Sequence, residues 1–221
     1  MKPYFIKTPS LIPALYSNQI WSFSSEKKEL FLTFDDGPTP EITHWALDIL
    51  KDFNAKATFF CIGKNIEEHP AIFKRIILEG HSVGNHTHNH VKGWKTITKD
   101  YLENTQKAQE VLNHLSEKNE LKLFRPPYGK IKTSQTKQLI QLGYTIVMWS
   151  VLSADFDQYI SEEQCYSNVI KNASSGSIIV FHDSVKASKN LKATLPKVLE
   201  YFSKKGYTFK KIEATNIAAL N

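Results

Sequence analysis

The sequence has no long apolar run. Its uninterrupted apolar stretches are only a few residues long, whereas a membrane-spanning helix needs about 20 such residues. The first residues, MKPYFIKTPSLIPALYS, also lack the continuous apolar block and the small-residue cleavage site of a secretory signal. We therefore expect no membrane span, and a cytoplasmic rather than an exported protein.

Cysteine is scarce as well. The chain has two cysteines, Cys61 and Cys165, which lie in different expected elements and show no CxxC spacing. This excludes a zinc site built on clustered cysteines, because no partner thiols are present. Two buried free thiols are the favoured interpretation and agree with a reducing compartment, and a single disulfide is the alternative.

The sequence also lacks a cluster of basic residues. Its 28 Lys and Arg against 22 Asp and Glu give a formal net charge of +6 and a pI near 9.1, which would suit a polyanionic partner. The lysines are nevertheless scattered over expected helix faces rather than gathered in one stripe, so we expect a solvated surface and no nucleic-acid partner. With 221 residues, 41% hydrophobic content and no repeat or low-complexity linker, the chain is expected to form one compact unit.

The sequence does contain a regular alternation of short apolar runs with amphipathic stretches. Apolar runs rich in β-branched and aromatic residues predict seven strands, at 30–34, 57–62, 82–85, 121–124, 145–150, 177–181 and 207–210. Helical periodicity predicts helices at 41–53, 65–79, 99–117, 134–142, 162–172 and 191–204. This alternation is typical of an α/β fold with a parallel sheet, either closed into a barrel or open and doubly wound.

Polar residues suited to chemistry follow several of the expected strands. Parallel α/β folds build their sites from the loops at the carboxyl ends of the strands, so residues far apart in sequence converge there. The candidates at this edge are Asp35, Asp36, His86, Arg125, Asp155 and His182.

Two motifs suggest a metal site at this edge. In FLTFDDGPTPE, residues 31–41, two carboxylates end a strand and precede a Gly-Pro turn. Alone this is ordinary turn chemistry, but adjacent carboxylates point in different directions, so one can bind a cation while the other faces a substrate. In GNHTHNH, residues 84–90, His86 and His90 are four residues apart, which places both imidazoles on one side of a turn. A mixed Asp, His, His set suits Zn²⁺ or another borderline divalent ion, whereas His88 lies off that side and is expected to be structural.

Two further motifs supply an arginine and a histidine. LFRPPYG, residues 123–129, is either a rigid loop whose arginine caps some carboxylate, or a site in which Arg125 holds Asp35 ionised and the Tyr128 amide serves an oxyanion. SIIVFHD, residues 177–183, ends a buried-type strand with His182. A single histidine there is usually structural, but the chemistry otherwise lacks a general acid. Asp155 could raise the pKa of His182 by charge pairing.

Together, TFDDGP at 33–38, HTxxH at 86–90, RPPYG at 125–129 and VxH at 180–182 resemble the polysaccharide deacetylase family, carbohydrate esterase family four. The resemblance covers residues 29–210. It implies a distorted (β/α) barrel, usually of seven strands, and a metal-dependent hydrolase that releases acetate from an acetylated oligo- or polysaccharide. Residues 29–221 would form the catalytic domain, and residues 1–28 would be an N-terminal extension packed on the barrel.

The resemblance also implies roles for the motif residues. Asp35 would be the base that activates water, and His182 the acid that protonates the leaving amine. Arg125 would tune Asp35, and Asp155 would tune His182. The ligands of one divalent ion, Zn²⁺ or alternatively Co²⁺, would be Asp36, His86 and His90. The expected substrate-binding residues are Pro126, Tyr128, Phe156 and Val180, with Val180 lining the pocket for the acetyl methyl group.

The chain departs from the family where LSADF, residues 152–156, replaces an Asp-x-x-Asp-Trp pattern. Phe156 keeps an apolar wall without the indole donor, and Leu152 removes a carboxylate, which leaves the pocket shape and the substrate open.

The N-acetyl groups of GlcNAc-containing glycans are the favoured substrate, because a neutral amine leaving group requires protonation by His182. Acetylated xylan, a small non-sugar amide, a phosphodiester and a catalytically inactive carbohydrate-binding relative are the alternatives. Binding alone needs neither a base nor an acid, and a nuclease would be expected to show further carboxylates and a basic groove.

Overall fold

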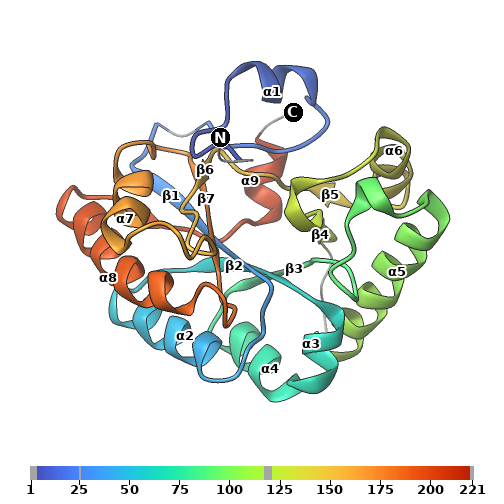
Figure 1. Cartoon of the computed structure of the whole chain (residues 1–221), viewed down its shortest axis with the longest axis horizontal. Helices are drawn as coiled ribbons and strands as arrows, with labels where there is room; N and C mark the ends of the chain where they lie inside the picture. The colour runs from blue at the N-terminus through green and yellow to red at the C-terminus, as the bar shows by residue number, and fades with distance from the viewer. Residues whose placement is uncertain (1–3, 25, 117–120, 220–221) are drawn as a thin grey trace.

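The computed structural model describes residues 4–24, 26–116 and 121–219. Within these residues, short parallel strands form one curled sheet (Figure 1). The spatial order is β5-β4-β3-β2-β1-β7-β6, and β8 pairs with the start of β1. The strands are β1 (Glu29–Asp35), β2 (Ala57–Cys61), β3 (Ser82–Asn85), β4 (Leu123–Phe124), β5 (Thr145–Ile146), β6 (Val151–Leu152), β7 (Ile178–His182) and β8 (Thr208–Phe209).

Helices lie around the outside of this curled sheet, and the short α1 and α9 lie near the described ends of the chain (Figure 1). This arrangement confirms the predicted distorted (β/α) barrel. The helices are α1 (Leu11–Leu15), α2 (Ile42–Asp52), α3 (Gly63–Glu68), α4 (Pro70–Leu78), α5 (Thr98–Leu115), α6 (Thr133–Gln141), α7 (Glu162–Ile170), α8 (Ser188–Lys204) and α9 (Ala214–Ala218), with 3₁₀ turns at Gly93–Lys95 and Pro127–Gly129.

The central strands β1, β2 and β7 are buried almost throughout. Such continuous burial is expected of parallel strands covered by helices, and it explains why these segments read as apolar runs rather than alternating patterns. Phe34 of β1 stacks on Phe59 of β2, with 4.9 Å between the ring centroids, and on Phe181 of β7 at 6.0 Å. The packed core fixes the strand ends from which the candidate site residues project.

Two expected helices differ from the structure in their bounds. The helix predicted at 65–79 is two helices, because Pro70 begins α4 and a proline is tolerated in the first turn of a helix but not in its interior. The helix predicted at 99–117 ends at Leu115, and its residue 117 lies outside the described residues.

The strand predicted at 145–150 is shortened to β5, and the chain forms the further short strand β6 just beyond it, so the sheet of the described residues has eight strands. β5 pairs with β4, whereas β6 pairs with β7. The chain between them bends because its two ends join opposite edges of the curled sheet. We call residues 147–150 the bend.

No helix in the described ranges is long and apolar enough to cross a membrane. Both cysteines are buried free thiols, as predicted.

Candidate active site

The carboxyl ends of the central strands bring the candidate residues together. Asp35 and His182 end the neighbouring strands β1 and β7 and are register partners. His86 follows β3, and Arg125 follows β4. The expected convergence at one edge of the sheet is therefore present.

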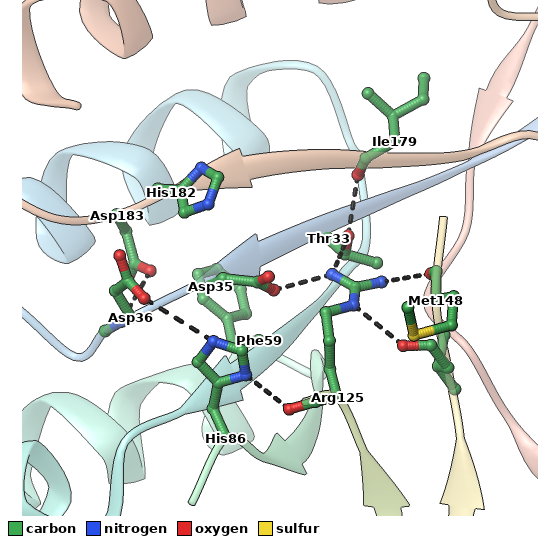
Figure 2. Close-up of polar contacts among 12 residues, drawn as sticks. Thr33, Asp35, Asp36, Phe59, His86, Arg125, Met148, Ile179, His182 and Asp183 are labelled. Atoms are coloured by element: carbon green, nitrogen blue, oxygen red, sulfur yellow. Dashed lines mark hydrogen bonds and ion pairs between the residues drawn. The ribbon is translucent and has the colours of Figure 1, made fainter. Parts of the chain in front are cut away.

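Asp36, His86 and His90 form a compact cluster whose candidate ligand atoms all lie within 4.8 Å of one another. Asp36 Oδ1 is 3.1 Å from His90 Nε2 and 3.7 Å from His86 Nε2. His86 Nδ1 donates a hydrogen bond to the Arg125 carbonyl at 2.7 Å (Figure 2). This bond fixes the His86 tautomer and leaves the Nε2 lone pair for a cation.

The donor set of this cluster fits a divalent metal ion. Asp36 Oδ1 is buried and has no hydrogen-bond partner in the described part of the chain, which is costly for a carboxylate oxygen unless a cation lies beside it. Burial lowers the pKa of His86 to about 4, so this imidazole is neutral, as a ligand must be. Two imidazoles and one carboxylate are a common set for Zn²⁺ with an open position.

His88 lies apart from the cluster. Its ring is buried, and its Nε2 atom is 3.6 Å from the Glu67 carboxylate. A methyl group on Gly63 would come within 2.6 Å of His88 Nδ1, so the imidazole fills the space against the start of α3. This contact is that of a packing residue.

Several site residues have a left-handed backbone that side chains other than glycine seldom adopt. The φ angles are 82° at Asp36, 53° at His90, 61° at Tyr128 and 61° at Ala154, which precedes Asp155. Such conformations cost about 1–3 kcal/mol each and tend to gather at functional sites, where the surrounding structure enforces them. Here they occur in the loops that carry Asp36, His90, Tyr128 and Asp155.

Asp35 is held by a fully buried arginine. Arg125 Nη1 donates to Asp35 Oδ1 at 2.7 Å and to Thr33 Oγ1 at 2.7 Å. The other guanidinium nitrogens donate to the bend, with Nε bonded to the Val147 carbonyl at 3.1 Å and Nη2 to the Met148 carbonyl at 2.9 Å (Figure 2). The guanidinium is thereby fixed, and only one of the two Asp35 carboxylate oxygens is engaged by it.

His182 is held by Asp155 in a second buried pair. His182 Nδ1 donates to Asp155 Oδ1 at 2.8 Å, and the His182 backbone amide donates to Oδ2 of the same carboxylate at 2.8 Å. Burial alone would lower the pKa of this imidazole. The charge and hydrogen bond of Asp155 outweigh it, with a further contribution from the charges of Asp36 and Asp35, and raise the pKa to about 9. His182 is therefore protonated at neutral pH, with Nε2 left for a substrate.

Asp183 holds the loop after β1 in place by hydrogen bonds. Its carboxylate accepts hydrogen bonds from the Gly37 amide at 3.1 Å and from the Thr43 hydroxyl. Burial raises the pKa of Asp183 to about 7. A methyl group on Gly37 would come within 2.0 Å of Asp183 Oδ2, so the glycine that follows Asp36 is required by close packing.

A cavity of about 410 Å³ opens over these groups. Most of the sequence-predicted site residues line it, namely Asp35, Asp36, His86, His90, Tyr128, Phe156, Val180 and His182. Arg125 and Asp155 lie behind the lining, where they contact Asp35 and His182. Pro126 is buried in its loop and is not among the lining residues.

Other lining residues were not identified from the sequence as site residues: Tyr4, Lys92, Lys130, Trp149, Ser184 and Lys186. Trp149 lies at the end of a predicted strand, a position that is itself a signal for a site residue. Lys92, Lys130 and Lys186 each lie a few residues beyond a recognised motif. Tyr4 lies in the first residues of the chain, outside every motif, and no sequence pattern connects it to the site.

Comparison with known proteins agrees with this geometry. The family model described as polysaccharide deacetylase matches residues 24–147, more than half of the chain. A peptidoglycan-N-acetylglucosamine deacetylase of Bacillus cereus is 42% identical over 158 residues, which are 72% of this chain and 57% of the relative. A chitooligosaccharide deacetylase of Azorhizobium caulinodans is 33% identical over 160 residues, 72% of this chain and 76% of the relative.

Among solved structures, the Bc1960 peptidoglycan N-acetylglucosamine deacetylase superposes with a TM-score of 0.85 at 36% identity, over 93% of this chain and 95% of that one. These matches confirm the predicted family, its barrel and the enzyme class, a hydrolase that removes acetyl groups from carbohydrate. The chain belongs to the polysaccharide deacetylase family.

Proposed function

We propose that this protein hydrolyses the N-acetyl groups of GlcNAc-containing glycans, such as peptidoglycan strands or chitin oligosaccharides, and releases acetate. The observation that carries the proposal is the pair of buried charge contacts, Asp35 with Arg125 and His182 with Asp155, at two adjacent strand ends beside the metal-type cluster. A base and an acid held next to a cation site are what amide hydrolysis requires.

Asp36, His86 and His90 would hold one divalent ion, for which Zn²⁺ suits the donor set and Co²⁺ is the alternative. When bound, the ion supplies Lewis-acid polarisation of the acetyl carbonyl and lowers the pKa of water.

Asp35 acts as the base in this proposal. Arg125 engages its Oδ1 atom, so Oδ2 remains to accept the proton of the attacking water. Asp35 is almost fully buried yet lines the cavity, which lets a substrate group approach the carboxylate while bulk water is limited. The fixed guanidinium keeps the carboxylate oriented without competing for the second oxygen.

His182 acts as the acid. Because Nδ1 donates to Asp155, the proton for the departing nitrogen comes from Nε2. An amine is expelled readily only after protonation, so the raised pKa of this imidazole suits a nitrogen leaving group. An oxygen ester would depend on this proton less, and this difference favours N-acetyl over O-acetyl substrates.

The remaining lining residues accommodate the substrate. Val180 and Leu152 offer an apolar surface for the acetyl methyl group. The backbone amide of Tyr128 would stabilise the oxyanion, and the Tyr128 ring, 58% exposed and 4.6 Å from the ring centroid of His90, is available to a sugar.

Acetate release from an N-acetylated chitin oligosaccharide, an acetylated xylan and a small non-sugar amide tests the proposal, with a nucleic acid tested separately for cleavage. We expect the chitin oligosaccharide to be the preferred substrate and the nucleic acid to remain intact. Preferential release from xylan or from the small amide would contradict the assignment of the substrate, because the catalytic groups would then serve another acyl compound.

A further inference from the structure

The N-terminal segment is hydrogen-bonded to the wall of the cavity. Lys7 forms an isolated antiparallel bridge with Val151 of β6. The Leu152 amide donates to the Ile6 carbonyl at 2.8 Å, and the Thr8 amide donates to the Ser150 carbonyl at 3.0 Å. These contacts hold the N-terminal segment beside β6.

Neighbouring side chains of this segment differ in their surroundings. Tyr4 and Ile6 pack against an apolar cluster that includes Leu152 and Val180, whereas the Phe5 side chain is 62% exposed. The Tyr4 ring meets the Phe156 ring edge-to-face, with 5.4 Å between the centroids. The Tyr4 hydroxyl donates a hydrogen bond to the Asp157 carboxylate, so both ends of the side chain are held.

This ring forms one end of a row that leads to the general acid. Phe156 meets the His182 ring edge-to-face at 5.0 Å between the centroids, and all three side chains line the same cavity. Tyr4 therefore stands one aromatic ring away from the group that would protonate the leaving amine. A sugar adjoining the one that loses its acetyl group would meet this part of the wall.

We propose that Tyr4 is a substrate-contacting residue that determines the preference for oligosaccharides over single sugars, by packing its ring against a neighbouring sugar unit. The inference rests on the proposed function. Tyrosine presents a large apolar face at a small cost in side-chain entropy, and the bond to Asp157 fixes the ring before the ligand arrives, which lowers the cost of binding.

The test compares wild type with Tyr4→Ala and Tyr4→Phe in the metal-loaded, full-length protein. The matched control is Tyr159→Ala, because Tyr159 lies in the same loop region as Asp157 but is 99% exposed and does not line the cavity. For chitotetraose we expect Tyr4→Ala to raise KM about tenfold, the scale of one lost aromatic contact. Tyr4→Phe keeps the ring, so its KM should rise by about threefold at most.

Tyr4→Ala should raise KM and leave kcat nearly unchanged. The increase in KM should be smaller for N-acetylglucosamine than for chitotetraose. A Tyr4→Ala protein with the KM of wild type for chitotetraose would overturn the inference, even if its melting temperature fell, because Tyr4 would then only brace the N-terminal segment. An equal increase in KM for N-acetylglucosamine and chitotetraose would also overturn the inference.

Failure of the proposed function would be visible separately, as absence of acetate release from every glycan by wild type. Calorimetric titration of chitotetraose into wild type and Tyr4→Ala then tests the inference by itself. Weaker binding by Tyr4→Ala supports it, whereas equal affinity, or no binding by wild type, contradicts it.

Discussion

Arg125 is a fully buried charge of the site, with 0% of its surface exposed. It is tolerable there because the guanidinium has hydrogen-bond partners on all three nitrogens and stacks 4.1 Å from the centroid of Phe60. The buried partner Asp35 has no second cation among the ion pairs of the described chain. Removing one member of such a pair leaves a buried charge uncompensated.

We therefore expect Arg125→Met to lower the free energy of unfolding by about 3–5 kcal/mol. The double variant Arg125→Met with Asp35→Asn should lose less than the sum of the single variants, since the stranded carboxylate is gone. Urea unfolding of the four proteins measures both quantities. Strict additivity would show that the two side chains do not act as a pair.

The raised pKa of His182 predicts that both the stability and the activity of the protein depend on pH. Its pKa in the folded protein, about 9, lies above the ordinary value of 6.5. The protonated imidazole therefore contributes stability that is fully present below about pH 6.5 and is lost as the pH rises through about 9. In the proposed reaction the same proton serves the leaving amine, so we expect kcat to fall as the pH rises through about 9.

Asp155→Asn tests the cause of this shift, because it removes the charge but keeps an acceptor for the His182 ring or amide. The alkaline fall of kcat should move to lower pH in the variant, and the maximal rate should decrease. An alkaline limb at the same pH in both proteins would mean that another group controls it.

At the scale of elements, the loop from β1 to α2 is fixed by hydrogen bonds to Asp183 and by close packing against it. Gly37 follows Asp36 and lies against the Asp183 carboxylate, which also binds Thr43 of α2. A methyl group at Gly37 has no room unless Asp183 moves. The position of Asp36, a proposed metal ligand, thus depends on a contact between the ends of β1 and β7.

Gly37→Ala should destabilise the protein by about 1–3 kcal/mol, the usual cost of overpacking a buried site. In the background Asp183→Ala the same substitution should cost less, because the side chain that it collides with is absent. Thermal unfolding of the metal-free proteins gives the comparison. An equal cost in both backgrounds would place the collision elsewhere.

The elements also explain which parts of the fold could be predicted. β1, β2 and β7 are buried runs with one sheet environment along their whole length, so their apolar pattern identified them. The bend at 147–150 could not be recognised in this way. It connects β5 at one edge of the sheet to β6 at the other edge, and its residues are as apolar as those of the flanking strands, so the apolar pattern does not show where β5 ends. The bend holds Arg125 through two backbone carbonyl groups. Because any residue offers a backbone carbonyl, this role cannot be predicted from the sequence.

At the scale of the whole molecule, the topology of the sheet accounts for the site residues that were predicted. Asp35, His86, Arg125 and His182 all end or follow parallel strands, so the direction of the strands gathers them without further information. Tyr4 reaches the cavity through a hydrogen bond to Asp157, 153 residues further along the chain. A long-range pairing of this kind follows from no local propensity or periodicity.

The metal cluster joins the end of β1 to the loop after β3, so a bound ion should stabilise the whole fold. At a free Zn²⁺ concentration 100 times the dissociation constant, the gain would be about 2.7 kcal/mol. We expect Zn²⁺ to raise the melting temperature of wild type and of His114→Ala, whose imidazole is exposed on α5. His86→Ala should lose this zinc-dependent shift, and an undiminished shift would place the ion at other residues.

The central claim is that the metal cluster acts together with Asp35 and His182 in removing acetyl groups. The most direct measurement is acetate release from chitin oligosaccharides by metal-stripped protein, with and without added Zn²⁺ or Co²⁺, for wild type, Asp35→Asn and His182→Ala. We predict that added metal restores release by wild type and that each variant loses at least about 100-fold of the restored rate. Release that is independent of metal, or that persists in either variant at the rate of wild type, would contradict this account.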